Sequence, residues 1–522
     1  MGIYLNPGND LFSEAINSDI YVDKSMLIDL TNKSLRTTGK HICISRPRRF
    51  GKSMAANMLA AYYDRKCDSR NLFENLAVSK TPDFETHLNK YDVIRLDISN
   101  FVSEKSDPMK TDEYITEDLL FELKKEYPNI EMPPRLTLGK ALATVYMETG
   151  IPFVFIIDEW DCIFRIFPDN NDAHKVYLDF LRDLLKDKAY VALNYATGIF
   201  PVKKYGKHSA LNMYHEYTMT SQKRFAEYTG FTDKEVKMLC GEDTDMFEEL
   251  KRWYDGYKVD NYEIYNPNSV VQAVTEKSFD SYWTKTETFE ALKVFIQLDM
   301  DGLRDSVIKM ISGEKVRVNT EKFQNDMTTF SSADDVITLL IHLGYLTYDN
   351  STGEAWIPNK EVGQEFINCI EDGGWEEVMN SIRKSDDLLT ATLNCDEKKV
   401  AEIIEEVHRQ NSSIIAYNNE LSLSVTLALA YYSARKQYEI IREFPSGEGF
   451  ADLAFIPRKG ANVPAIVAEL KYNKSAEGAI SQIKDRNYTD KLKAFSGEIL
   501  LVGINYDREN KKHECQIEKI VK

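Results

Sequence analysis

The chain has 522 residues, of which 43% are hydrophobic and 28% charged, and its formal net charge is -18. This length exceeds what one hydrophobic core supports, so we expect about two to four domains in a water-soluble protein. No apolar run is long enough to span a bilayer, and the first residues lack a secretion-signal pattern, which argues against a membrane partner. The seven cysteines have no paired spacing, which argues against structural zinc and favours a cytoplasmic location.

The negative charge is unevenly distributed along the chain. Residues 440–522 carry 14 Lys and Arg against 12 Asp and Glu, so this region is nearly neutral while the rest is strongly acidic. A nearly neutral region can present a local basic groove, and nucleic acid therefore stays open as a partner despite the overall charge.

A phosphate-binding loop is predicted at residues 41–54. A short apolar run, His41–Ser45, is followed by a turn-forming loop and at once by a helix-forming run. This order directs backbone N–H groups and a positive helix end at one point, an arrangement that binds phosphate. We expect Lys52 to reach the β- and γ-phosphates of ATP and the Ser53 hydroxyl to ligate Mg²⁺. The predicted nucleotide-binding residues of the loop are Arg46, Pro47, Arg48, Arg49, Phe50, Gly51, Lys52, Ser53 and Met54.

One position of this loop departs from the general pattern G-x-x-x-x-G-K-S, because Arg46 stands where the pattern has glycine. The alternative interpretation is a surface turn that contains Gly-Lys-Ser by chance. The strand before the loop and the helix after it favour phosphate binding.

Two further strand ends supply candidate residues for the same site. The apolar run from Ile151 feeds directly into Asp158 and Glu159, as expected of a central strand in a parallel sheet that binds ligands at its carboxyl edge. Asp158 would hold Mg²⁺ through water and Glu159 would polarise the attacking water as a catalytic residue. A later strand ends at Thr197, which either senses the γ-phosphate or only terminates the strand.

A second candidate site lies near the C-terminus. A helix over 411–433 carrying Glu420, strands over 438–443, 450–456 and 465–472, a helix over 475–488 and a strand over 498–503 give the order αβββαβ. Asp452 and Glu469 fall on adjacent strands, and Lys471 shares a face with Glu469 because side chains in a strand repeat every second residue. We expect Asp452 and Glu469 to bind Mg²⁺ (or Mn²⁺) and, with Lys471, to catalyse phosphodiester hydrolysis. The alternative is a solvated strand pair.

Three residues near this second site are supporting candidates. They are Glu420, Gln482 and Tyr488, whose alternative role is that of helix-surface residues.

These motifs resemble two known families. The loop Ser45–Ser53, with Tyr21-Val-Asp-Lys24, Ile156–Glu159, Thr197-Gly198, Tyr254–Tyr257 and Tyr265–Pro267, resembles the predicted bacterial AAA-ATPase-like family, in which arginine is usual at position 46. The C-terminal part resembles the PD-(D/E)XK nuclease superfamily domain that commonly follows this ATPase. Phe450 departs from that pattern, which often has arginine after the glycine.

The expected fold is an α/β multidomain protein. We predict an AAA-like P-loop ATPase core with a parallel sheet at 1–215, a helical lid at 216–285, a helical, winged-helix-like connector at 286–375 and a restriction-endonuclease-like domain at 376–522.

The predicted function is an ATP-binding and ATP-hydrolysing module coupled to a Mg²⁺-dependent nuclease, with DNA as the expected substrate and RNA as the alternative. A prokaryotic role in defence or mobile-element processing follows only by analogy. Two other interpretations are an ATP-dependent switch whose nuclease-like domain is inactive and only binds nucleic acid or a protein, and a protein that binds ATP without hydrolysing it. No arginine finger can be assigned from the sequence, so a finger supplied in trans would require a homo-oligomer.

Overall fold

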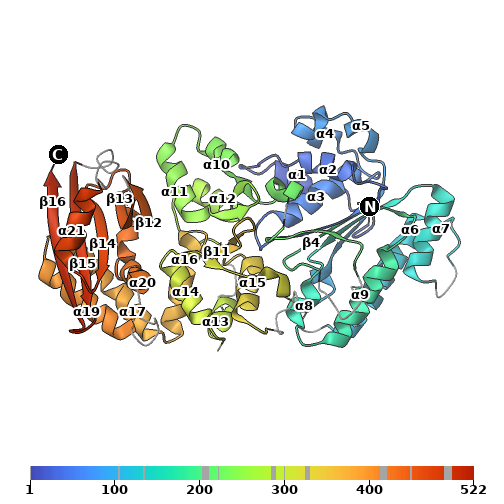
Figure 1. Ribbon diagram of the computed structural model, residues 1–522. Coiled ribbons are helices and arrows are strands. Elements are labelled where there is room, and N and C mark those ends of the chain that lie inside the picture. The colour runs from blue at the N-terminus through green and yellow to red at the C-terminus, as the bar shows by residue number, and fades with distance from the viewer. Residues whose placement is uncertain are drawn as a thin grey trace. The chain divides into compact units, whose positions relative to one another are not determined.

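The computed structural model describes residues 2–103, 106–132, 136–202, 211–221, 223–283, 290–298, 300–323, 330–411, 420–446, 449–486 and 497–521. The chain forms two compact units, one made of residues 1–292 and 317–363 and the other of residues 293–316 and 364–522. Each unit has its own sheets and helices (Figure 1). The four-part division expected from the sequence stays a prediction.

A parallel sheet of five strands forms the centre of the first unit, in the order β2-β3-β4-β1-β5. Its strands are β1 (His41–Ser45), β2 (Asp92–Asp97), β3 (Phe153–Asp158), β4 (Val191–Gly198) and β5 (His215–Tyr217). Because β3 lies directly between β2 and β4, and β4 beside β1, the carboxyl ends of β1, β3 and β4 meet at one edge. The expected parallel sheet with helices is confirmed.

Helices cover both faces of this sheet (Figure 1). Side chains alternate between the faces, since Ile42, Val154 and Ile156 pack with α3 while Phe155 and Ile157 pack with α6, α7 and α9. The helices of this part are α1 (Asp10–Ile16), α2 (Met26–Asn32), α3 (Lys52–Tyr63), α4 (Arg70–Phe73), α5 (Phe84–His87), α6 (Thr111–Glu126), α7 (Leu138–Thr149), α8 (Cys162–Ile166) and α9 (Asn171–Leu185).

The rest of the first unit is mainly helical. A small antiparallel sheet, β6-β8-β7, lies among α10, α11 and α12, and the hairpin β10–β11 follows α15. Its elements are the 3₁₀ helix η4 (Lys223–Tyr228), β6 (Phe231–Thr232), α10 (Asp233–Cys240), α11 (Thr244–Tyr254), β7 (Tyr257–Val259), β8 (Tyr262–Tyr265), α12 (Pro267–Glu276), α15 (Ala333–Leu343), β10 (Thr347–Asp349) and β11 (Glu354–Trp356). Each of the three sequence boundaries between the units falls within one element, namely α13 (Glu290–Ile296), β9 (Val316–Arg317) and α16 (Lys360–Asp372).

The second unit contains a five-stranded sheet in the order β12-β13-β14-β15-β16, in which only β14 and β15 are parallel. The core packs helices α18, α19 and α20 on one face and α21 on the other. Its elements are α14 (Leu303–Ile311), α17 (Glu376–Arg383), α18 (Ser385–Leu393), α19 (Glu397–Asn411), α20 (Glu420–Ala430), β12 (Tyr438–Ser446), β13 (Gly449–Pro457), β14 (Ala465–Tyr472), α21 (Ala476–Asp485), β15 (Glu498–Asp507) and β16 (Lys512–Val521).

The order αβββαβ predicted for this C-terminal part is confirmed from α20 to β15. Two details differ from the expectation. Asn411 ends α19, so the described part of the helix expected over 411–433 is α20 alone. The final strand β16 was not predicted; it pairs with β15 along its whole length.

Candidate functional site

The loop between β1 and α3 joins the carboxyl end of a parallel strand to the amino end of a helix, as a phosphate-binding loop does. Gly51 precedes α3 with φ 83, a backbone conformation that glycine adopts without a Cβ penalty. Lys52 begins the helix and is only 4% exposed. Its Nζ donates to the backbone carbonyls of Arg46 at 3.0 Å and Pro47 at 2.9 Å. Burial lowers the pKa of Lys52, and the nearby Glu159 opposes this shift.

Three residues of this loop, Arg46, Pro47 and Phe50, contact the helical part of the same unit. Arg46 is fully buried and donates from Nη2 to the carbonyl of Ala226 at 3.3 Å. Its Nε and Nη1 have no hydrogen-bond partner, and burial lowers the pKa of Arg46 to about 9. The ring of Phe50 packs edge-on against Tyr257, and a Cβ added to Gly344 would lie 2.7 Å from Pro47. These residues therefore shape the loop.

Asp158 and Thr197 lie side by side because β3 and β4 are neighbours. The Thr197 hydroxyl donates to Asp158 Oδ1, which also accepts the N–H of Glu159 at 3.1 Å. Asp158 is fully buried and its Oδ2 has no hydrogen-bond partner. The two residues that the sequence placed at separate strand ends are thus brought together by the strand order.

Glu159 is oriented by an ion pair that the sequence did not reveal. Arg165, on α8, pairs with Glu159 and lies 3.5 Å from Asp161. Asp161 in turn accepts the N–H groups of Ile199 and Phe200 at 3.0 and 2.8 Å. The cations around Glu159 hold its pKa below the usual value, although burial acts in the opposite direction. These cations therefore favour the ionised form of Glu159.

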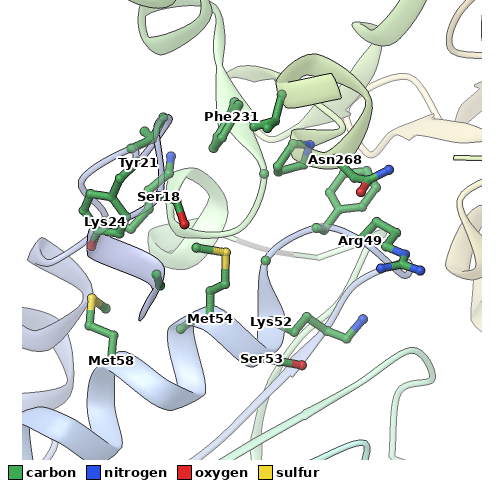
Figure 2. A pocket seen from close by; sticks show the side chains of 18 of the residues that line it. Ser18, Tyr21, Lys24, Arg49, Lys52, Ser53, Met54, Met58, Phe231 and Asn268 are labelled. Atoms are coloured by element: carbon green, nitrogen blue, oxygen red, sulfur yellow. The ribbon is translucent and has the colours of Figure 1, made fainter. Parts of the chain in front are cut away.

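A cavity of about 600 Å³ opens in front of this loop (Figure 2). Of the predicted residues, it is lined by Arg48, Arg49, Phe50, Gly51, Lys52, Ser53, Met54 and Glu159. Arg46, Pro47, Asp158 and Thr197 do not line it. The volume is within the range of small-molecule sites in proteins.

Sequence reasoning did not assign the far side of this cavity. Figure 2 shows Lys52 and Ser53 at one side and Tyr21, Phe231 and Asn268 across the cavity from them. The other unassigned residues that line it include Phe12, Ile20, Val22, Lys24, Met58, Tyr228, Pro267 and Val271. Two sequence motifs, Tyr21-Val-Asp-Lys24 and Tyr265-Asn-Pro267, were the available signal for this side of the cavity. No local pattern indicates their roles. An apolar slot beside a phosphate-binding end is suited to a nucleotide base.

The donor set around the loop fits Mg²⁺ bound to ATP. Ser53 lines the cavity, and Asp158 Oδ2 is a buried carboxylate oxygen that no protein donor satisfies. Hydroxyl and carboxylate oxygens are the ligands that Mg²⁺ prefers. A bound Mg²⁺ would neutralise phosphate charge, while Lys52 and Glu159 would orient the phosphates and the attacking water.

The second unit brings together Asp452 on β13, Glu469 and Lys471 on β14, and Gln482 on α21. Glu469 is 2% exposed; its Oε1 accepts from Gln482 and, at 3.0 Å, from Lys471 Nζ. Asp452 Oδ2 accepts the N–H of Leu470 at 2.7 Å. Burial and the charge of Asp452 raise the pKa of Glu469. Of the supporting candidates, Gln482 is described in the structure and lies in this cluster.

The two other supporting candidates are Glu420 and Tyr488. Glu420 is the first residue of α20, and Tyr488 lies outside the described residues. Phe450, in the position where the related pattern often has arginine, is 61% exposed.

The cluster also fits a divalent cation. Glu469 Oε2 is buried and lacks a hydrogen-bond partner, and Asp452 supplies a second carboxylate close by. Within the described parts of the chain, no group of three or more His, Cys, Asp and Glu side chains gathers in a metal-binding arrangement. A site of two carboxylates completed by water and backbone or substrate oxygens is typical of Mg²⁺ rather than zinc. A bound cation would lower the pKa of a water molecule, and Lys471 would orient that water.

The fold and the two clusters are those expected of a protein that joins a P-loop domain to a nuclease-type domain. The comparison with protein families agrees. Residues 8–206 match the predicted AAA-ATPase family, and residues 424–516 match the PD-(D/E)XK nuclease superfamily. The chain therefore combines a domain of the predicted AAA-ATPase-like family with a C-terminal domain of the PD-(D/E)XK nuclease superfamily.

A similar full-length relative is a protein of Azotobacter chroococcum mcd 1, described as an uncharacterized protein in the vnfD 5' region. It is 23% identical over 94% of both chains. Among solved structures, the chain is similar to the Aeropyrum pernix ORC2 protein in ADPNP and ADP complexes, with a TM-score of 0.30, 9% identity and coverage of 68% of this chain and 97% of that one. It is also similar to Cdc6p from Pyrobaculum aerophilum, with a TM-score of 0.25, 10% identity and coverage of 69% and 98%.

None of the described helices combines the length and the hydropathy needed to cross a bilayer. All seven cysteines are free thiols.

Proposed function

We propose that the protein hydrolyses ATP in its first unit and uses this cycle to control a metal-dependent nuclease in its second unit, with DNA as the substrate. The observation that carries the nuclease assignment is the buried carboxylate of Glu469. It is held by Lys471 and Gln482, lies beside Asp452 and keeps one oxygen without a protein partner. Burying a carboxylate costs free energy unless its oxygens are satisfied, and a bound cation would satisfy this one.

In the nucleotide site, Lys52 would bind the β- and γ-phosphates once its bonds to the two loop carbonyls are released. Ser53 and Asp158 would hold Mg²⁺, with Thr197 fixing the orientation of the Asp158 carboxylate. Glu159 would accept the proton of the attacking water. Tyr21, Phe231 and Asn268 would contact the base or ribose at the other side of the cavity.

In the nuclease site, Asp452 and Glu469 would hold Mg²⁺ or Mn²⁺, and Lys471 would orient the hydrolytic water toward the scissile phosphate. Gln482 would fix the rotamer of Glu469. DNA is proposed over RNA as the substrate of this nuclease-type domain. A cytoplasmic location is proposed because seven free thiols are typical of a reducing compartment.

The test is cleavage of linear, circular and single-stranded DNA, and of RNA, with Mg²⁺ or Mn²⁺, in the presence and absence of ATP. Wild type is compared with Glu469→Gln, which preserves shape but removes the charge, and with Lys52→Ala. The matched control is Glu477→Gln, which changes an exposed glutamate at the start of α21. We expect Glu469→Gln to lose at least about 100-fold in cleavage rate, since one metal ligand is lost, and Glu477→Gln to cut like wild type.

The effect of ATP separates the coupled enzyme from its alternatives. ATP that changes the cleavage rate of wild type but not of Lys52→Ala supports the coupling. If wild type and Glu469→Gln are equally inert on every substrate, the nuclease assignment is wrong. Retained ATP-dependent DNA binding would then identify a switch whose nuclease-like domain only binds.

A further inference from the structure

A lysine outside the phosphate-binding loop lines the far side of the nucleotide cavity. Lys24 ends the motif Tyr21-Val-Asp-Lys24, and Figure 2 shows it across the cavity from Lys52 and Ser53. Its side chain is 15% exposed, and burial lowers the pKa of Lys24 while the charge of Glu235 opposes this shift. Burying an ammonium group costs free energy unless acceptors satisfy it, so the partners of Lys24 decide its role.

Two acceptors of Lys24 lie in the helical part of the same unit. Its Nζ donates to the backbone carbonyl of Glu227 in η4 and to Glu235 Oε2 on α10, each at 2.6 Å. Glu235 Oε2 also accepts the N–H and the hydroxyl of Thr232, at 2.7 and 2.8 Å, in the capping box that begins α10. Lys24 therefore adds a cation to the carboxylate that caps this helix.

The residues on either side of this lysine bind a different part of the chain. Asp23 Oδ2 accepts the N–H of Ala77 at 2.8 Å. Ser25 Oγ accepts the N–H of Val78 at 3.1 Å, and both N–H groups belong to the 3₁₀ helix η1 (Ala77–Lys80). Val78 packs in the same core cluster as α3. The segment is thus fixed to the sheet domain by its flanking residues, and the lysine between them reaches the helical part.

The contacts of Lys24 fix two chain segments that line the cavity. Lys24 binds the peptide group between Glu227 and Tyr228. Its partner carboxylate binds the peptide group between Phe231 and Thr232. Tyr228 and Phe231 line the cavity, and aromatic rings can stack on any nucleotide base because every base has a π-face. The ion pair therefore holds the segments from which a base-binding wall would be built.

We infer that Lys24 is a positioning residue for the base of ATP, because its ion pair with Glu235 holds the aromatic wall of the cavity next to the segment that carries Tyr21. This inference rests on the proposed binding of ATP. Lys24 acts on the base through Tyr228 and Phe231 and does not bind phosphate, since two protein acceptors engage its ammonium. The contact with the base is the same before and during hydrolysis, so it contributes to ATP affinity and not to kcat.

Two ligands test whether Lys24 acts on the base. Isothermal titration calorimetry measures the affinity of the full chain for ATP and for inorganic tripolyphosphate, both with Mg²⁺; the second ligand has the phosphates but no base. Lys24→Met keeps the aliphatic stem and removes the ammonium. We expect it to bind ATP about 10- to 100-fold more weakly, the effect of losing hydrogen bonds to a charged group, and to bind tripolyphosphate as wild type does.

The matched control is Lys33→Met. Lys33 follows the last residue of α2, pairs with Asp29 and has a side chain that is 61% exposed. It does not line the cavity, so Lys33→Met should bind both ligands like wild type.

A double-mutant cycle tests the ion pair itself. Glu235→Gln removes the charge of the partner but keeps a side chain that can cap α10. Lys24→Met and Glu235→Gln combined should weaken ATP binding no more than Lys24→Met alone, because the effects of two residues in one contact are not additive. In steady-state hydrolysis, Lys24→Met should raise KM by about 10- to 100-fold and leave kcat within about two-fold of wild type.

The outcomes that overturn this inference differ from those that overturn the proposed function. Lys24→Met that binds ATP as tightly as wild type has no role in the site. Equal losses for ATP and tripolyphosphate, a large fall in kcat, or additive losses in the double variant would each show that Lys24 does not act on the base through Glu235. Wild type that binds neither ligand overturns the proposed ATP site as well, whereas wild type that binds ATP without turnover overturns only the proposed hydrolysis.

Discussion

At the scale of single residues, the nucleotide site depends on side chains that orient other side chains. Thr197 contacts Asp158 but does not line the cavity, and Arg165 pairs with Glu159 from outside it. Such supporting residues fix the geometry of the groups that would contact Mg²⁺ and water. In the second unit, Gln482 likewise orients Glu469, because its side-chain amide donates to Glu469 Oε1.

Thr197→Val tests this supporting role. Valine keeps the shape of threonine but cannot donate to Asp158 Oδ1, so the carboxylate loses its side-chain donor. We expect a fall of about 10- to 100-fold in ATP hydrolysis or in apparent Mg²⁺ affinity, measured by titrating Mg²⁺ at saturating ATP. Thr144→Val, which removes a hydroxyl bonded only to its own helix α7, is the control. Equal activity of both variants and wild type would show that Thr197 only terminates its strand.

At the scale of elements, close approach of backbones fixes how the helical part of the first unit folds. The turn between α11 and β7 contains Gly256 with φ 95, and a Cβ added there would lie 2.0 Å from the carbonyl oxygen of Pro358. Asn359 also donates to the carbonyl of Asp255 at 2.8 Å. The turn and the segment before α16 therefore pack backbone against backbone, which only glycine permits at this position.

Gly256→Ala should consequently destabilise the first unit much more than the same substitution at a glycine that also has a positive φ but has no close neighbour. Gly150 ends α7 with φ 68 and no atom within 4 Å of an added Cβ, so Gly150→Ala should cost only the backbone strain of about 1–2 kcal/mol. Gly256→Ala adds an overpacking cost of roughly 1–3 kcal/mol. Urea denaturation of the full chain measures both. Equal midpoints for the two variants would contradict the close packing.

At the scale of the whole molecule, each unit contains two described histidines whose pKa burial lowers to about 4 or about 3. Burial lowers the pKa of His41 to about 4 and of His342 to about 3 in the first unit. In the second unit it lowers the pKa of His408 to about 4 and of His513 to about 3. His408 Nδ1 and His513 Nε2 share a hydrogen bond of 3.2 Å, which two protonated rings cannot form.

Both units should therefore lose stability in mild acid. Because the folded pKa of each histidine lies below its unfolded value of about 6.5, the unfolded chain binds more protons below that pH. The free energy of unfolding that the neutral histidines contribute is fully present above pH 6.5. It is lost as the pH falls toward 4, by up to about 1.4 kcal/mol per pH unit for each histidine. Thermal unfolding between pH 7 and 5 measures the effect before most carboxylates titrate.

His342→Phe gives the matched comparison. The phenylalanine keeps a ring against Phe323 but binds no proton, so its unfolding midpoint should fall less steeply with decreasing pH than that of wild type. A wild-type midpoint that stays constant from pH 7 to 5 would contradict the burial of neutral histidines.

Much of both sites follows from local sequence. The apolar run before Arg46 and the helix-forming run after Gly51 fix a strand, a loop and a helix, because hydrophobic pattern and turn residues act over a few positions. The same holds for Asp158 at its strand end and for Glu469 and Lys471 on one face of β14. These features need no knowledge of distant residues.

Tertiary structure decided which of these groups meet and which do not. The order β3-β4-β1 sets Thr197 against Asp158, and the packing of η4 against the loop turns Arg46 away from the cavity that Arg48 lines. Tyr21 and Asn268, far apart in sequence, line one cavity, and β16 completes a sheet that its own sequence did not predict. The physical reason is that burial, ion pairs and side-chain hydrogen bonds form between residues brought together only when the whole chain folds.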